Sequence, residues 1–501
     1  MLYIKNNKVV MNSIITNIKR NSLLAATTML LATTFTLKGV EAQSQESGIK
    51  IDLSKGPIYA FGATPWYTED LIFSAPSNKD QSERVLPFTI DTGTTMIWAT
   101  LDYCSDPACM DHTDNGNTDS NMVSYLQTGV DYDLSNISIT EQVSFGPWGS
   151  MGADIAESTV AIKNTPDVNL FSRALQFIGA NDYSKDQFRT LNWYGGIGLP
   201  SHGKYIHALP SLEKDKINGY GNDFFFGQLH QNMMNNKKID FQPVFSNWYT
   251  DNTGGFLLGA VDASIYDSTT EISMTKNDHV IPGSKSMWAT DIVDIKVGGI
   301  VPRDMPDMKF SFFVDSGSSR FKGDYDIVNP ILKELYNPQI HEWIKGEGEY
   351  KEYNVGLRYK KTKTPNPVNE KKWDIYVGEC ANNKNASYIT LDASDYTYKV
   401  KNPENPDIDE WHVALHSLGG FPSEPSKNVI GGLLAGTQLM EKFYTTFEYN
   451  YDETDKQYSQ KEIKFYNIKD GKFNGNNCSK SNPPRKARMR SSVKPINLSK
   501  F

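Results

Sequence analysis

The sequence predicts a mostly β protein made of two lobes. Residues 88–100 read Phe-Thr-Ile-Asp-Thr-Gly-Thr-Thr-Met-Ile-Trp-Ala-Thr, and 224 residues later residues 312–321 read Phe-Phe-Val-Asp-Ser-Gly-Ser-Ser-Arg-Phe. Each copy is a β-branched and aromatic run that ends abruptly in an acid, a hydroxyl residue and a glycine, which is typical of a buried strand followed by a tight loop. The repeat indicates that each half of the chain ends one strand in a carboxylate, Asp91 or Asp315.

This pairing of acids predicts general acid–base chemistry. If the two loops meet, Asp91 and Asp315 cannot both ionise cheaply and share one proton. The ionised acid then acts as general base on a water and the protonated one donates to a carbonyl, so that a peptide bond is hydrolysed without a covalent intermediate. We expect Gly93 and Gly317 to let the backbone approach the carboxyl groups closely. Thr92 and Ser316 are expected to form hydrogen bonds across the junction, and the hydroxyls of Thr94 and Ser318 to hold the outer carboxyl oxygens.

The two motifs resemble those of the pepsin-like aspartic proteases. Trp98 follows Asp91 by seven residues, as in that family. The family also has a hydrophobic-hydrophobic-glycine segment after each active-site loop, and its counterparts here are residues 196–198 and 429–431. The similarity covers roughly residues 57–469. It implies an all-β, bilobal pepsin-like fold, with two mostly antiparallel β lobes, a few short helices and a central cleft. An extended polypeptide substrate would lie in this cleft, paired by backbone hydrogen bonds.

Residues 136–163 alternate apolar and polar side chains on either side of Gly-Pro-Trp-Gly, which predicts a β-hairpin. The resemblance implies that this hairpin is the flap that closes over the substrate. Phe145 and Gly146 stand where the family has a tyrosine and a glycine, so the hydrogen bond that the tyrosine makes towards the Trp98 position would be lost. A purely structural aromatic on the hairpin face is the alternative.

Four cysteines occur in the chain. Cys104 and Cys109 follow the first motif where pepsins carry a small disulfide loop, and in a secreted chain they are expected to form a bridge; in a cytosolic chain they would be free thiols or half a metal site. Cys380 lies where pepsins carry half of a second disulfide, but its usual partner is missing. Cys478 is the remaining candidate, and this second pairing stays open.

Charge and spacing argue against other classes of function. The formal charge is -8 although residues 1–42 and 480–501 are basic, so the body between them is more acidic still, which argues against nucleic-acid binding. His412 and His416 have the spacing of a helical metal pair, but the glutamate of a zinc protease is absent between them, so we interpret them as structural. The sequence therefore predicts no metal and no other cofactor.

The chain is predicted to have five parts. Residues 1–42 combine basic residues, an apolar run too short for a stable membrane span and a small-residue cleavage site, which predicts a secretory signal peptide and no transmembrane anchor. An organelle transit peptide is the alternative. A short lead-in (residues 43–56) precedes an N-terminal lobe (57–262) and a C-terminal lobe (263–478), and the basic tail (479–501) is predicted to be disordered.

Other segments carry local signals. Residues 224–234 have apolar residues at near-helical spacing, and residues 325–344 predict a second helix that ends near Gly346. Strands are expected near residues 66–72, 254–262, 443–451 and 462–467, and polar surface insertions at residues 350–372 and 401–410.

The sequence thus predicts a monomeric, secreted or endolysosomal aspartic endopeptidase. Possible glycan acceptors are Asn136, Asn385, Asn477 and Asn497. The rival hypothesis is a catalytically weak or silent pepsin fold that serves as a binding or structural protein. It is favoured by Phe145, by the short stretch available for a prosegment, and by Arg320, where pepsins prefer an apolar residue.

Overall fold

The computed structural model divides the chain into two compact units, Met1–Glu46 and Ser47–Phe501. All described residues belong to the second unit: 48–58, 62–78, 85–104, 125–138, 143–144, 150–163, 165, 170–184, 188, 191–205, 207–208, 223–236, 239–275, 286–305, 309–345, 355–361, 363–377, 387–401, 409–417, 429–469 and 475–476. The predicted signal peptide and the basic tail lie outside them, so both remain predictions. No helix among these residues is long and apolar enough to cross a membrane.

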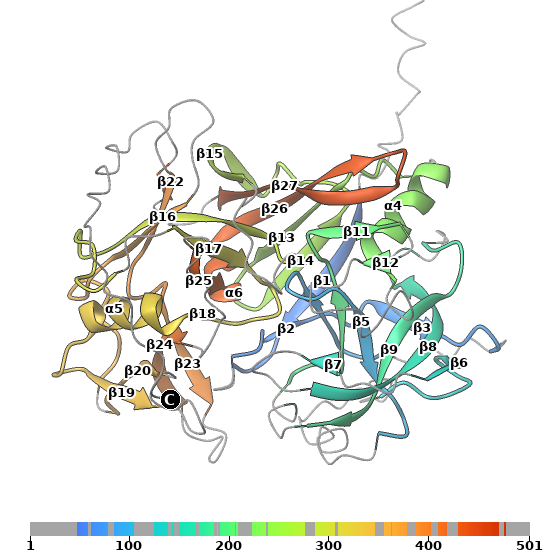
Figure 1. Cartoon of the computed structure of the whole chain (residues 1–501), viewed down its shortest axis with the longest axis horizontal. Helices are drawn as coiled ribbons and strands as arrows, with labels where there is room; N and C mark the ends of the chain where they lie inside the picture. Colours follow the sequence, from blue (N-terminus) through green and yellow to red (C-terminus); the bar gives the residue numbers. More distant parts are fainter. Residues whose placement is uncertain are drawn as a thin grey trace, which may run out of the picture. The chain divides into compact units, whose positions relative to one another are not determined.

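The second unit is mostly β, as predicted, and its described strands form three sheets (Figure 1). The eight-stranded sheet contains β3 (Leu71–Ser74), β4 (Phe88–Asp91), β5 (Ile97–Thr100), β6 (Asp133–Ser138), β7 (Val143–Ser144), β8 (Ser150–Ile162), β9 (Leu175–Tyr183) and β10 (Gly195–Gly198). The eleven-stranded sheet contains β16 (Ala289–Val297), β17 (Lys309–Val314), β18 (Phe321–Gly323), β19 (His341–Lys345), β20 (Val355–Tyr359), β21 (Trp373–Val377), β22 (Ser387–Leu391), β23 (Thr397–Lys401), β24 (Asp409–Ser417), β25 (Val429–Ala435) and β28 (Gly475–Asn476). These two sheets are the bodies of the two lobes.

The nine-stranded sheet joins strands from both ends of the chain. It contains β1 (Ile49–Lys55), β2 (Trp66–Tyr67), β11 (His202–Lys204), β12 (His207–Ala208), β13 (Val244–Tyr249), β14 (Thr253–Leu258), β15 (Tyr266–Thr275), β26 (Phe443–Asp452) and β27 (Gln457–Ile468). In Figure 1, β13, β14, β26 and β27 run between the two lobe sheets. Because β13 pairs with β26, the two halves of the chain share one hydrogen-bonded layer.

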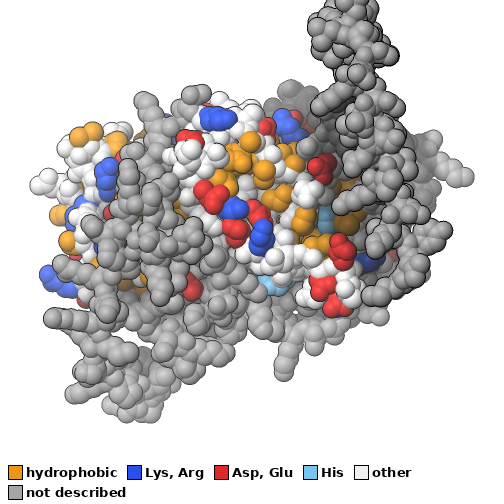
Figure 2. Space-filling view, turned by 90° about the horizontal axis from the view of Figure 1, so that it is seen from above, with side chains coloured by type: hydrophobic (Ala, Val, Ile, Leu, Met, Phe, Trp, Pro, Cys, Tyr) orange, Lys and Arg blue, Asp and Glu red, His pale blue; other side chains and the backbone are white. Residues whose placement is uncertain are grey.

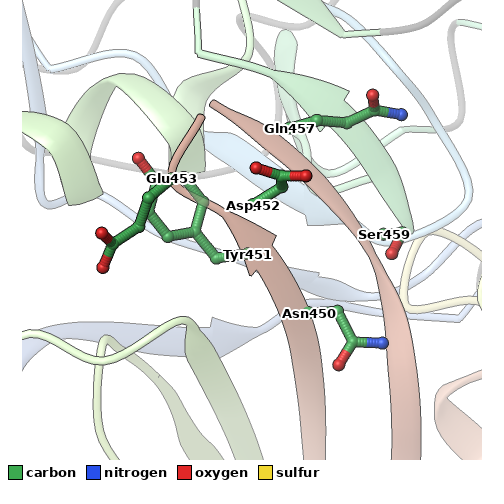
Figure 3. A pocket seen from close by; sticks show the side chains of 6 residues that line it. All are labelled: Asn450, Tyr451, Asp452, Glu453, Gln457 and Ser459. Atoms are coloured by element: carbon green, nitrogen blue, oxygen red, sulfur yellow. The ribbon is translucent and has the colours of Figure 1, made fainter. Parts of the chain in front are cut away.

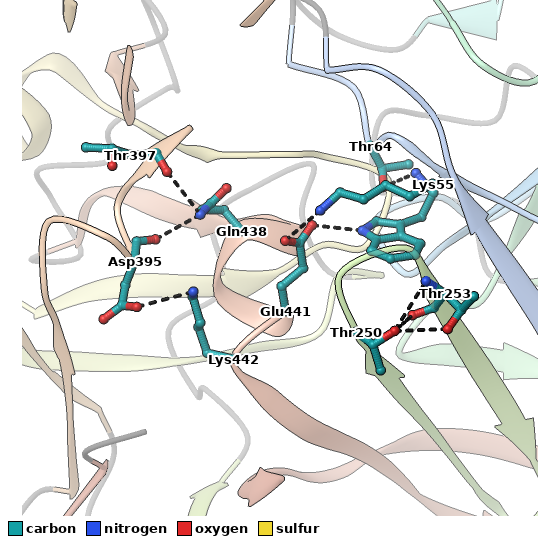
Figure 4. A network of polar contacts seen from close by, with 10 residues as sticks. Lys55, Thr64, Thr250, Thr253, Asp395, Thr397, Gln438, Glu441 and Lys442 are labelled. Atoms are coloured by element: carbon teal, nitrogen blue, oxygen red, sulfur yellow. Dashed lines mark hydrogen bonds and ion pairs between the residues drawn. The ribbon is translucent and has the colours of Figure 1, made fainter. Parts of the chain in front are cut away.

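Aromatic packing and one polar network hold this shared layer together. Phe245 of β13 stacks on Phe447 of β26 with ring centroids 4.7 Å apart, and burying each ring contributes about 1.5–3 kcal/mol. Glu441 follows α6 (Thr437–Met440) and accepts hydrogen bonds of 2.9 Å from both Lys55 Nζ and Trp66 Nε1 (Figure 4). The carboxylate of Glu441 therefore ties the N-terminal strands to a helix near the other end of the chain.

Several local predictions are confirmed. Residues 224–234 lie almost entirely in α4 (Phe225–Asn236), and residues 443–451 and 462–467 lie in β26 and β27. β6 and β7 both pair with β8, so the hairpin predicted over residues 136–163 is present, although its turn lies outside the described residues.

Two predictions are wrong. The helix expected over residues 325–344 is α5 (Tyr325–Leu335), and strand β19 takes up residues 341–345. Tyr336 already has the extended backbone of a helix end, and Pro338 disfavours helical backbone at the residue before it, so the helix cannot continue. The segment 350–372, expected to be a surface insertion, contains β20, which pairs with β19 and β24.

Candidate active site

The same strand arrangement occurs in both lobes and places an acid at the end of a strand. β10 pairs in parallel with β4 and antiparallel with β5, and β25 pairs in parallel with β17 and antiparallel with β18. The β4 carbonyl of Asp91 accepts a hydrogen bond of 2.9 Å from the amide of Leu199, and the amide of Asp315 donates to Ala435 at 2.9 Å. Each acid is thus anchored by the segment that pairs in parallel with its own strand, at Leu199 just past the end of β10 and at Ala435 of β25.

Asp91 and Asp315 lie face to face, and their side chains are hydrogen-bonded to each other. The amide of Gly93 donates to Asp91 Oδ1 at 2.7 Å, and the amide of Gly317 donates to Asp315 Oδ1 at 2.9 Å. The hydroxyl of Ser318 donates to Asp315 Oδ2 at 2.7 Å. In both loops, therefore, the amide of the motif glycine holds one oxygen of the loop's own acid.

Thr94, the counterpart of Ser318, is buried, but among the described residues its hydroxyl makes no matching bond to Asp91. The Asp91 carboxyl is instead held by the amide of Gly93 and by the Asp315 carboxyl. The near-symmetry of the site breaks at this position.

Each glycine of the two motifs faces the carboxyl group of the opposite lobe. A Cβ on Gly93 would lie 2.6 Å from Asp315 Oδ1, and a Cβ on Gly317 would lie 2.4 Å from Asp91 Cγ. Both distances are far shorter than an ordinary carbon contact of 3.4–4 Å. The two acids can approach each other only because neither glycine carries a side chain.

The hydroxyl residues next to the acids lock the two loops together. The amide of Thr92 donates to Ser316 Oγ at 3.0 Å, and the amide of Ser316 donates to Thr92 Oγ1 at 2.9 Å. Each hydroxyl then donates across the junction, Thr92 to the carbonyl of Val314 at 2.9 Å and Ser316 to that of Ile90 at 2.6 Å. Both side chains are buried, so the loss of one partner would leave unsatisfied polar groups in the interior.

The electrostatics of the pair favour one shared negative charge. Desolvation raises the pKa of the Asp91 carboxyl well above its ordinary value, and the charge of Asp315 and the hydrogen bond to it act in the same direction. The Gly93 amide and the Lys322 ammonium oppose this rise. Asp91 keeps part of its surface exposed, whereas Asp315 is 7% exposed, so the two acids differ in their contact with solvent.

Sequence reasoning missed Lys322, a buried lysine close to the pair. Its ammonium donates to Ser318 Oγ at 3.2 Å, and Ser318 in turn contacts Asp315. The available signal was a lysine within a strand whose residues are otherwise apolar or glycine, Phe321–Gly323. A charged side chain in such a position is rarely buried without a partner.

Trp98 packs with the described strands of the hairpin predicted to be the flap. It is buried in a hydrophobic cluster that also contains Val143 of β7 and Met151 of β8. Its ring packs edge-on against Tyr183 and Trp193, with centroids 6.4 and 5.7 Å apart. Phe145 and Gly146 lie outside the described residues, so the role expected for the flap remains a prediction.

The cysteine and metal predictions rest partly on residues that are not described. Cys104 is disulfide-bonded, and the other three cysteines lie outside the described residues, so its pairing with Cys109 remains a prediction. His412 and His416 are both buried on β24, a strand rather than a helix. In the described part of the chain, no group of three or more His, Cys, Asp or Glu side chains could hold a metal ion.

A separate pocket lies at the end of the β26–β27 hairpin and includes neither acid (Figure 3). It is lined by Asn450, Tyr451, Asp452, Glu453, Gln457 and Ser459. On the face shown in Figure 2, the described lysine and arginine side chains lie among aspartates and glutamates. Neither feature competes with the pair of acids as a site for chemistry.

The fold and this site define a class: a bilobal, all-β protein in which each lobe supplies one strand-end carboxyl to a hydrogen-bonded pair. Comparison with known families agrees, since the model for the eukaryotic aspartyl proteases matches residues 81–456. The chain belongs to this family. A search of curated proteins found no match.

Proposed function

We propose that this protein is an aspartic endopeptidase in which Asp91 and Asp315 together activate a water molecule. Family membership supports aspartic protease activity in general. In the proposed mechanism, the ionised acid removes a proton from water as it attacks the peptide carbonyl, while the protonated acid donates to the carbonyl oxygen. An extended peptide would lie across the pair, beneath the hairpin of β7 and β8.

The observation that carries this proposal is the hydrogen bond between the two carboxyl groups, supported by the absence of a side chain on Gly93 and Gly317. Two acids in contact within a desolvated site share one proton, which supplies a base and an acid at the same time. A pair of acids that served only to stabilise the fold would be an expensive arrangement, because like charges close together favour unfolding.

The test is replacement of either acid. Asp91→Asn and Asp315→Asn should each lower kcat on an unstructured protein, assayed between pH 3 and 6, by at least about 10²-fold, the usual contribution of general acid–base catalysis. Asp251→Asn, which changes an exposed aspartate outside the site, should leave kcat unchanged. Full proteolysis by both site variants would refute the mechanism.

Binding of a statine-containing peptide separates the enzyme from the rival, silent scaffold. Such a peptide mimics the tetrahedral intermediate, so an active site should retain it and a silent fold should not. In the described part of the site, buried Arg320 favours the silent scaffold, because pepsins prefer an apolar residue at this position.

We further propose that the protein is secreted or enters the endolysosomal compartment after loss of residues 1–42, with one catalytic acid in each of the lobes 57–262 and 263–478. The acid-poor, basic start of the sequence supports this proposal. N-terminal sequencing of the secreted product tests it, because a mature protein that still begins at Met1 would exclude cleavage.

A further inference from the structure

Lys322 is a buried cation in the middle of the C-terminal lobe. It is 3% exposed, and its strand β18 lies between β24 and β25, where Lys322 pairs with His416 and Leu434. A Cβ on Gly62 would lie 3.2 Å from Lys322 Cε, so the segment around Gly62 covers the lysine from the other lobe. Burying an ammonium is costly unless nearby groups stabilise its charge.

The ammonium reaches the pair of acids through one hydroxyl. Lys322 Nζ donates to Ser318 Oγ at 3.2 Å, and the Ser318 hydroxyl donates to Asp315 Oδ2 at 2.7 Å. The two bonds together limit the distance from the ammonium to the carboxyl oxygen to about 6 Å, a range in which an opposite charge favours the ionised carboxylate. Both donors point towards Asp315. The charge of Lys322 also acts on Asp91, but among the described residues no such chain of two side-chain donors ends on the Asp91 carboxyl.

Four titratable or charged groups surround Lys322. Arg320 directly precedes β18, and His416 lies on the neighbouring strand β24. The other two groups are the acids themselves, Asp91 and Asp315. Burial lowers the pKa of Lys322 to about 7, with Arg320 acting in the same direction and both acids opposing it. Lys322 therefore carries its charge throughout the acid range.

We propose that Lys322 is a positioning residue that, through Ser318, keeps the negative charge of the pair on Asp315 and leaves the shared proton on Asp91. This inference deepens the proposed function and rests on it. It gives the two acids different roles: Asp315 accepts the proton of the water, and Asp91 donates to the carbonyl oxygen. The charge of Lys322 also keeps the pair singly ionised at a lower pH than two acids alone would allow.

The test is the acid limb of the pH profile of kcat/KM. Lys322→Met keeps the length of the side chain and removes its charge, so the acid limb should move to higher pH by about one unit. Ser318→Ala, which breaks the connection, should move it in the same direction, and Lys322→Arg should leave it in place. Lys296→Met is the matched control, because Lys296 is a partly buried lysine that donates to Tyr376 on another part of the sheet.

A second measurement keeps this inference separate from the proposed function. In protein labelled with ¹³C at the aspartate carboxyl carbons, the two resonances that disappear in Asp91→Asn and Asp315→Asn report ionisation whether or not peptides are cleaved. Their titration should move by about one unit in Lys322→Met. If the wild-type protein cleaves no peptide but the carboxyl titration still moves in Lys322→Met, this inference stands and the proposed function is refuted.

Two results would overturn the inference. One is an acid limb and a carboxyl titration that both stay at their wild-type positions in Lys322→Met and Ser318→Ala. The other is a change in KM alone with an unmoved acid limb, which would make Lys322 a substrate contact. If Lys322→Met does not fold, Ser318→Ala and Lys322→Arg still decide between these outcomes.

Discussion

Gly317→Ala is the sharpest test of the way in which the two lobes meet. The added Cβ would lie 2.4 Å from Asp91 Cγ and 2.5 Å from both of its carboxyl oxygens, whereas an ordinary contact begins at 3.4 Å. The Asp91 carboxyl or the loop of Gly317 must therefore move by about 1 Å. A misplacement of that size costs on the order of 10²-fold in rate, so kcat should fall by about 100-fold.

The assay is kcat and KM on a peptide substrate, together with urea unfolding of the same preparation. KM should change little, because the alanine methyl group displaces the carboxyl pair rather than the peptide. Gly299→Ala is the control for backbone strain: Gly299 has φ +81° in the turn after β16, and no atom lies within 4 Å of its Cβ position. This control should lose about 1–2 kcal/mol of stability and keep its kcat.

The reasoning would be refuted by a Gly317→Ala protein with kcat within about twofold of wild type, a difference of about 0.4 kcal/mol in barrier height. It would also fail if Gly299→Ala lowered kcat as strongly, because the loss would then follow stability rather than the position of Asp91.

Two further predictions concern stability. Thr92→Val removes the hydroxyl that serves Ser316 and Val314, so the free energy of unfolding in urea should fall by about 2–3 kcal/mol, against about 0.5 kcal/mol for exposed Thr253→Val; equal losses would contradict the buried junction. Burial lowers the pKa of His230 to about 4, so the unfolded chain binds a proton first as the pH falls below 6.5. His230 should therefore cost on the order of 2 kcal/mol of stability between pH 6.5 and 5, and a His230→Gln protein with an unchanged pH slope would exclude this.

The sequence alone predicts the local elements of the site. An apolar run that ends in Asp-Thr-Gly or Asp-Ser-Gly predicts a strand followed by a tight loop, and the repetition of this pattern identifies both acids. The amphipathic spacing that predicted α4 is a local property of the same kind. The end of α5 also has a local signal in Pro338, although this helix was predicted to end near Gly346.

The sequence by itself determined which residues are brought to the two strand ends; only the tertiary structure decided what each of them faces. That Gly317 lies against Asp91, that β13 pairs with β26, and that Lys322 is buried beside Ser318 all depend on the packing of segments far apart in the chain or on the interior of a lobe. Local residue patterns set strand, turn and helix, whereas these contacts arise from how the three sheets close on one another. A lysine in a short strand looks the same in the sequence whether its ammonium meets water or a carboxyl group, and the fold makes that choice.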